Sequence, residues 1–282
     1  WQRFASEQMM QRATVCSEWW DERVSLALYA HIPAGNLGND AVEDIADVFY
    51  CRLLKQSRHV LWTSQGRIPD LGGHEQDENR MLLSEQMFSS AQRPEVHVPG
   101  AYRSICVELE LHGLAVNTLV NAAYLNDIGG SAMLDNSASC SAALTSLQQL
   151  VTNWYRDVKQ TGNLRADELL GNFYRWLCSP TSRVYDPALV ALVQSLVHKV
   201  FLELLNELRS LGAEIVHASF NKFILCTKRV SMANARSYYR YLVDTIKTKP
   251  LFSVIEMTPT KWWRQLIFMD MYNFGGVEID SE

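Results

Sequence analysis

Residues 186–227 read DPALVALVQSLVHKVFLELLNELRSLGAEIVHASFNKFILCT, and this stretch decides the fold class. Asp186 followed by Pro187 is a typical helix start, because Asp caps the free N–H groups and Pro fits the first helical position. Leucine and valine then recur every three or four residues. This spacing predicts one long amphipathic helix over 187–211, which Gly212 ends.

Two β-rich runs follow this helix directly, AEIVHA at 213–218 and KFILCT at 222–227. The three residues between them predict a hairpin. Upstream, residues 102–111 (YRSICVELEL) alternate between apolar and polar side chains, which is typical of a half-buried strand. In this strand Glu108 and Glu110 lie on one face, and Glu108 is expected to be exposed at an edge of the sheet.

The rest of the chain is mainly helical before the long helix and mixed after it. Residues 66–79 and 127–141 are small, polar or rich in turn formers, which predicts loops. Periodicity predicts helices at 1–30, 41–56, 142–159, 166–178 and 231–247, a helix after Gly113, and strands at 59–63, 251–257 and 263–271. The fold class is therefore α+β, a mainly antiparallel sheet with helices on one face.

Composition is that of a globular protein, with 48% apolar and 20% charged residues. The net charge of −5 argues against nucleic-acid binding over the whole surface, which needs a positive face. The charge is uneven, because residues 199–264 contain 11 Lys and Arg against five Asp and Glu. This basic segment is either a solvated helix face or a contact surface for nucleic acid or an acidic partner.

Six cysteines lie at wide spacings without a CxxC pair, which predicts buried free thiols in a reducing compartment and no metal site. We expect no membrane span, since no long uninterrupted apolar run is evident. The chain begins with Trp1 and a polar stretch, so we interpret it as an internal piece of a longer intracellular protein.

Familiar catalytic motifs are absent from the sequence. There is no GxGxxG or GxxxxGK[ST] phosphate loop, no HExxH and no GxSxG. Paired strand carboxylates can perform acid–base chemistry, so a hydrolase or transferase that uses Glu108, Glu110 or Cys226 remains one hypothesis. No histidine or metal-ligand set at a suitable spacing accompanies these residues.

Two segments resemble the palm motifs of B-family DNA polymerases. Residues 110–119 (ELHGLAVNTL) match in spacing a D-x-x-S-L-Y-P-S-I-like motif, and residues 217–225 (HASFNKFIL) match the Y-G-D-T-D-S hairpin motif. In the family, the aspartates of these motifs bind two Mg²⁺ ions. Here Glu110 takes the first position, and Ser219 and Asn221 stand where the two hairpin aspartates should be.

A third resemblance, to the fingers helix, rests on NFYRW at 172–176 and RVY at 183–185. In this register Asp167 occupies the place of the lysine that contacts the incoming triphosphate. The resemblance therefore implies a degenerate palm with reduced helical fingers and no catalytic residue. It implies a lead-in at 1–75, palm at 76–126, a loop with reduced fingers at 127–185 and palm again at 186–282.

Longer stretches resemble the inactive second polymerase module in the C-terminal half of the catalytic subunits of DNA polymerase epsilon. They are HIPAGNL (31–37), HVLWTSQGRIPDLGGHE (59–75), YRSICVELELHGLAVNTL (102–119), FYRWLCSP (173–180), SFNKFILCTKR (219–229) and FMDMYNFGGV (268–277). The resemblance implies a nuclear, non-catalytic scaffold in DNA replication that docks the polymerase on the replicative helicase and the other subunits. The parent protein is expected to be a DNA-directed DNA polymerase that uses Mg²⁺, an iron–sulfur cluster and zinc outside these residues.

A second functional hypothesis is a nucleic-acid-binding module without catalysis. The basic segment mixes tyrosines with Lys and Arg, and this combination suits stacking on bases together with phosphate contacts. The residues expected to make these contacts are Lys222, Lys228, Arg229, Arg236 and Arg240.

Overall fold

The computed structural model describes residues 1–61, 63, 95–122, 124 and 138–279 of the chain. These residues form two compact units, and each unit is assembled from separate segments of the sequence. The first unit contains residues 1–63 and 142–186, and the second contains residues 64–141 and 187–282. The predicted loop at 66–79 and most of the one at 127–141 lie outside the described residues.

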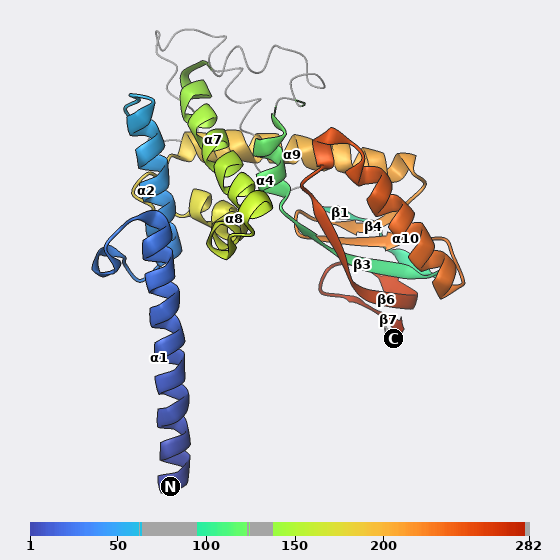
Figure 1. Cartoon of the computed structure of the whole chain (residues 1–282). Coiled ribbons are helices and arrows are strands. Elements are labelled where there is room, and N and C mark those ends of the chain that lie inside the picture. Colours follow the sequence, from blue (N-terminus) through green and yellow to red (C-terminus); the bar gives the residue numbers. More distant parts are fainter. Residues whose placement is uncertain (62, 64–94, 123, 125–137, 280–282) are drawn as a thin grey trace. The chain divides into compact units, whose positions relative to one another are not determined.

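The first unit is helical (Figure 1). The predicted helices are confirmed, with one change, since the helix expected from residue 142 begins four residues earlier and takes up the end of the predicted loop. The elements are α1 (Gln2–Ala30), η1 (Ala34–Asn36), α2 (Ala41–Gln56), α7 (Ala138–Thr161) and α8 (Leu164–Cys178).

Two of these helices begin at side-chain caps. The Asp40 carboxylate accepts a hydrogen bond from the Glu43 N–H at 3.1 Å, and the Asn163 side chain accepts one from the Arg165 N–H at 2.9 Å. Each cap satisfies a backbone donor that has no partner inside the helix. Aromatic and aliphatic side chains then fill the core of the unit, including Ile45, Tyr50, Leu147, Trp154, Phe173 and Trp176.

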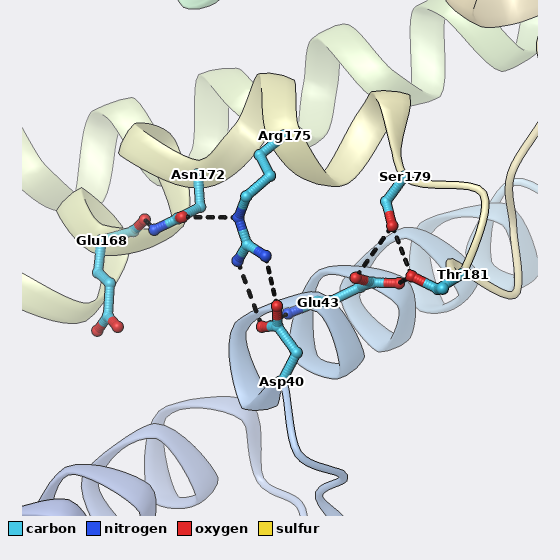
Figure 2. Close-up of polar contacts among 7 residues, drawn as sticks. All are labelled: Asp40, Glu43, Glu168, Asn172, Arg175, Ser179 and Thr181. Carbon is cyan, nitrogen blue, oxygen red and sulfur yellow. Dashed lines mark hydrogen bonds and ion pairs between the residues drawn. The ribbon is translucent and has the colours of Figure 1, made fainter.

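Polar contacts tie the start of α2 to the end of α8 (Figure 2). Arg175 donates to both carboxylate oxygens of Asp40, and this guanidinium lowers the pKa of that carboxyl. One turn further along α2, the two oxygens of Glu43 accept hydrogen bonds from the hydroxyls of Ser179 and Thr181, at 3.2 and 2.7 Å. These groups are at least partly exposed, so the contacts orient the two helices more than they stabilise them.

A buried carboxylate fixes the turn after α8. Asp47, 6% exposed, accepts hydrogen bonds from the Trp176 indole at 2.8 Å, the Ser182 hydroxyl at 2.7 Å and the Arg183 N–H at 2.9 Å. Three donors replace the water that this charge loses on burial, so the carboxylate is compatible with the apolar core.

The second unit contains the sheet and the helices that cover it. Its helical elements are α4 (Leu114–Val120), α9 (Pro187–Ser210), α10 (Met232–Lys247) and η2 (Pro250–Phe252). Its strands are β1 (Val96–His97), β2 (Gly100–Tyr102), β3 (Cys106–His112), β4 (Glu214–Ala218), β5 (Lys222–Cys226), β6 (Glu256–Phe268) and β7 (Phe274–Ile279). The α+β class, the long helix and the hairpin after it are confirmed.

The strands pair antiparallel in the order β1-β4-β5-β3-β6-β2, and β7 pairs with β6. Both α9 and α10 pack on one face: the Phe201 ring of α9 lies 5.7 Å from that of Phe223, and the Tyr239 ring of α10 lies 6.0 Å from that of Trp262. The opposite face carries its own small core, made of Cys106, Val216, Ile224, Cys226, Trp263, Leu266 and Phe268. Strand β3 therefore lies in the interior of the sheet, between β5 and β6.

Two predicted strands were wrong. Of residues 59–63, those that are described form no strand, and the His59 N–H instead donates to the Leu54 carbonyl at the end of α2. Within the strand expected at 251–257, the first two residues belong to the 3-10 helix η2, a turn follows, and only Glu256 and Met257 are in a strand, at the start of β6. The two expected C-terminal strands merge into the 13-residue β6, with a register shift at Pro259 opposite β3.

Among the described helices, α9 is long and apolar enough to cross a membrane by length and composition. The expectation that the chain has no membrane span stays a prediction, because a buried core helix passes the same test. In α9, 67% of the most apolar stretch is buried. A core helix that is apolar nearly all round has the same composition as a membrane span.

Replacing Asp47 by Ala should lower the free energy of unfolding by about 3 kcal/mol, because the indole, hydroxyl and amide that it satisfies stay buried without a partner. Asp167→Ala, at an exposed position of α8, is the matched control and should cost less than about 0.5 kcal/mol. Urea unfolding of both variants measures the difference. Equal costs would show that the contacts of Asp47 do not hold the turn.

Candidate functional site

The end of β3 and the tip of the β4–β5 hairpin lie side by side. The Leu111 N–H donates to the Asn221 carbonyl at 2.8 Å, and Glu110 is opposite Lys222 in the strand register. Three of the positions matched to polymerase motifs are therefore neighbours: Glu110, Ser219 and Asn221.

The hairpin tip uses its own polar groups to close the turn. The Lys222 N–H donates to the Ser219 hydroxyl oxygen at 3.2 Å, and the Ser219 N–H donates to the Lys222 carbonyl at 2.8 Å. Asn221 is exposed, and its amide, like the hydroxyl, carries no charge. Glu110 is the one charged residue among these three positions, and it is half-exposed beside His112.

Lys222 is directed back along the sheet and not toward solvent. Its ammonium contacts the Glu108 carboxylate at 2.6 Å and lies 5.4 Å from the centre of the Phe274 ring. Glu108, only 7% exposed, also accepts a hydrogen bond from the Trp263 indole at 3.4 Å. The prediction of an exposed, edge-facing Glu108 was wrong, because a strand with neighbours on both sides and a second small core on this face leaves its carboxylate little access to water.

The chemistry of these donors does not fit two Mg²⁺ ions. Mg²⁺ prefers oxygen ligands, and a two-metal site needs several carboxylates that converge on ions about 4 Å apart. The strand end offers the carboxylate of Glu110, a hydroxyl that already closes a turn and a neutral amide, with an ammonium nearby. Among the residues that the structure describes, no group of three or more His, Cys, Asp or Glu side chains could hold a metal ion.

The fourth position matched to a polymerase motif, Asp167, is in the first unit. It is exposed in the first turn of α8, next to Glu168, whose carboxylate pairs with Arg165 at 3.1 Å. The structure describes the helical unit and the sheet unit separately, so Asp167 is not assigned to the strand end.

Several cations of the basic segment are engaged within the second unit. Besides Lys222, Lys228 lies 3.7 Å from Glu214, and the Arg229 guanidinium lies 5.6 Å from the centre of the Tyr238 ring. Lys249 pairs with Glu207 at 2.5 Å and Lys261 with Glu278 at 3.7 Å. Arg236 and Arg240 lie on α10, where Arg240 is exposed.

Sequence reasoning missed a histidine pair on the face of the sheet that α9 and α10 leave open. His217 on β4 is opposite His97 on β1, and their rings stack with centroids 4.9 Å apart. Burial, with the neighbouring His97 as a second cause, lowers the pKa of His217 to about 4, so it stays neutral at physiological pH. Because β1 has only two residues, periodicity gives no signal for it.

Replacing Lys222 by Ala should cost about 3 kcal/mol of unfolding free energy, because Glu108 then remains buried without its counter-charge. Lys228→Ala removes the exposed ion pair with Glu214 and should cost less than about 0.5 kcal/mol. The double variant Glu108→Gln/Lys222→Met should recover most of the loss in the same urea titration. No recovery would mean that the charge of Glu108 is not the cause.

Comparison with known proteins gives the family. A family model described as a domain of unknown function (DUF1744) matches residues 1–277. The chain is 34% identical over 303 residues to a DNA polymerase epsilon catalytic subunit of Arabidopsis thaliana, with 100% of this chain and 14% of the relative covered. It is 34% identical over 297 residues to the corresponding protein of Schizosaccharomyces pombe, and 28% identical over 305 residues to that of Saccharomyces cerevisiae.

Those two alignments cover 98% and 100% of this chain, and 13% and 14% of the relatives. The chain thus spans only a small part of the relatives that it matches. It belongs to the DUF1744 family, and over its full length it is similar to one segment of the catalytic subunits of DNA polymerase epsilon.

Proposed function

We propose that the chain is a non-catalytic structural segment of a DNA polymerase epsilon catalytic subunit. The observation that carries this proposal is the chemistry of the strand end. At the three positions matched to palm motifs, the chain has Glu110, Ser219 and Asn221, and beside them the Lys222 ammonium is held by Glu108. The sheet is consistent with a degenerate palm that keeps its packing and has lost its metal ligands.

Electrostatics supports this proposal. A divalent ion at the strand end would meet the carboxylate of Glu110, because the carboxylate of Glu108 is already paired with the Lys222 ammonium. One carboxylate supplies too little negative charge for the two metal ions that phosphoryl transfer requires. The hydroxyl of Ser219 contributes no charge and is already used in the turn.

We further propose that the whole polypeptide is a DNA-directed DNA polymerase of nuclear replication, with Mg²⁺, iron–sulfur and zinc sites outside these residues. This segment would then dock the polymerase on the replicative helicase and the accessory subunits. The first unit offers a surface for such contacts, because Trp19 and Trp20 of α1 are 51% and 52% exposed. Exposed tryptophans are enriched where proteins bind one another.

The decisive experiment separates chemistry from assembly in the complete polypeptide. Glu110→Gln should leave the rate of nucleotide incorporation unchanged, because this carboxylate has no metal to hold. Trp19→Ala/Trp20→Ala should leave incorporation unchanged as well, and should lower co-purification of the accessory subunits and the helicase at least tenfold.

Leu28→Ala, at a third exposed position of α1, is the matched control for loss of apolar surface. A tenfold loss of incorporation in Glu110→Gln, without a loss of stability, would contradict the non-catalytic proposal. Unchanged co-purification of the tryptophan variant would contradict docking through α1. It would not affect the conclusion about catalysis, which depends on nucleotide incorporation by Glu110→Gln.

A second candidate function is nucleic-acid binding without catalysis, and the arrangement of α10 favours it. At four- and seven-residue intervals, Arg236, Arg240 and Lys247 share one face of this helix. Arg240 and Lys247 are exposed, in contrast to the lysines that carboxylates neutralise.

If this face contacts phosphates, Arg240→Glu/Lys247→Glu should weaken binding of labelled DNA at least tenfold and reduce its salt dependence by about two counterions. Fluorescence anisotropy between about 50 mM and 200 mM salt, with Lys228→Glu/Lys261→Glu as the charge-matched control, measures both quantities. Equal effects of the two double variants would show that net charge, and not this face, governs binding.

A further inference from the structure

Two buried cysteines face each other across the middle of the sheet. Cys106 opens β3 and Cys226 closes β5, and the strand register places them directly opposite one another. Their exposed fractions are 0% and 2%. Packing with Val216 and Ile224 explains why two small apolar side chains lie here, but it does not explain the polar groups that surround one of the sulfurs.

The hydrogen-bond pattern shows which kind of pair they form. At one end the Thr227 N–H donates to the Ile105 carbonyl at 3.0 Å, and at the other the Leu111 N–H donates to the Asn221 carbonyl at 2.8 Å. The facing pairs Ile105–Thr227 and Leu111–Asn221 are therefore hydrogen-bonded pairs. Hydrogen-bonded and non-hydrogen-bonded pairs alternate along an antiparallel ladder, so the next pair after Ile105–Thr227, which is Cys106–Cys226, is a non-hydrogen-bonded pair.

This position has the shortest separation between facing residues, with Cα atoms about 4.5 Å apart. Disulfides span Cα separations of about 4.4–6.8 Å, so the two sulfurs can bond without movement of either strand out of register.

Three groups lie against the sulfur of Cys226. The Ser104 hydroxyl lies 3.3 Å from it, and the Lys228 N–H hydrogen-bonds to it. The Cys106 thiol, which donates to the Ser104 carbonyl at 3.5 Å, faces it across the strand pair. The interaction with Cys106 is the largest cause that lowers the pKa of Cys226 to about 6, and the same interaction raises the pKa of Cys106. The two thiols therefore shift each other in opposite directions, with Cys226 the more acidic, and the facing pair has the arrangement of a nucleophilic cysteine with a resolving partner.

We propose that Cys226 and Cys106 form a peroxide-reactive dithiol that closes a cross-strand disulfide between β5 and β3. The Cys226 thiolate attacks one oxygen of hydrogen peroxide; the O–O bond breaks, and the sulfur becomes a sulfenic acid as hydroxide leaves and takes up a proton. The Cys106 sulfur then displaces the sulfenic hydroxyl, which leaves as water with the thiol proton. In total, two thiols and one peroxide give one disulfide and two waters.

Access to the sulfur is by the segment that follows β5. Lys228 has a positive φ of 56°, a conformation that non-glycine residues seldom adopt, and Val230 is 88% exposed. The side-chain contacts of this segment, Lys228 with Glu214 and Arg229 with Tyr238, are made by exposed residues, so local opening costs less there than inside the sheet. The Lys228 N–H of this segment hydrogen-bonds to the Cys226 sulfur, so movement of the segment away from the sheet would uncover that sulfur to solvent.

The test uses the full chain, reduced and then exposed to hydrogen peroxide, with free thiols blocked by N-ethylmaleimide before digestion. We expect mass spectrometry under non-reducing conditions to find the tryptic peptide 223–228, which contains Cys226, linked to the peptide 104–156, with fragment ions that place the link at Cys106 and not at Cys140. Reduction should separate them. Cys51 is the internal control. It is exposed to solvent, but partial burial of its thiol raises its pKa, so it should remain a free thiol at the same peroxide dose and be alkylated by N-ethylmaleimide.

Two variants test the chemistry. Cys106→Ser should stop at the sulfenic acid of Cys226, detectable with dimedone, and Ser104→Ala should slow disulfide formation several-fold without removing a thiol. Iodoacetamide alkylation of Cys226 should rise with pH around its pKa of about 6 in the parent chain. Absence of the linked peptide at peroxide doses that oxidise Cys51, or an alkylation midpoint at the ordinary thiol pKa of about 8.5, would overturn the proposal.

Discussion

A buried carboxylate in the middle of a sheet is the constraint on which the second unit depends. Glu108 lies on β3, with β5 on one side and β6 on the other, and a charge in that place is tolerated only with a counter-charge and hydrogen bonds. Lys222 supplies the first and the Trp263 indole the second. Because Lys222 follows the hairpin tip directly, the ion pair also fixes the tip against the end of β3.

The same contact links structure to the proposed loss of chemistry. The Lys222 ammonium engages Glu108, which leaves Glu110 as the carboxylate among the three matched positions at the strand end. The proposed function requires only that the sheet keep its strand order and covering helices, without metal ligands at that end. The helical unit obeys an analogous rule, since the buried Asp47 is compatible with the core because three donors surround it.

Membership of a family that is similar to one segment of polymerase epsilon catalytic subunits gives this arrangement a context. In a large polypeptide, a segment that only binds is free to change its polar residues as long as its packing survives. The apolar partners around α9 and β5 and the buried polar contacts are what such a segment must retain. The facing thiols of β3 and β5 add a covalent bond that those two strands can form with each other.

The sequence by itself determined the α+β class, the helices of the first unit, the long helix and the hairpin, because their side-chain periods are local properties of the chain. It also marked Glu110, Ser219 and Asn221, since their motifs have fixed spacing. Only the tertiary structure decided that Glu108 is buried, that Lys222 is its partner, that β6 is one strand and that Cys106 faces Cys226. Those facts depend on which strands become neighbours, and pairing between strands that lie far apart along the chain leaves no period in the sequence.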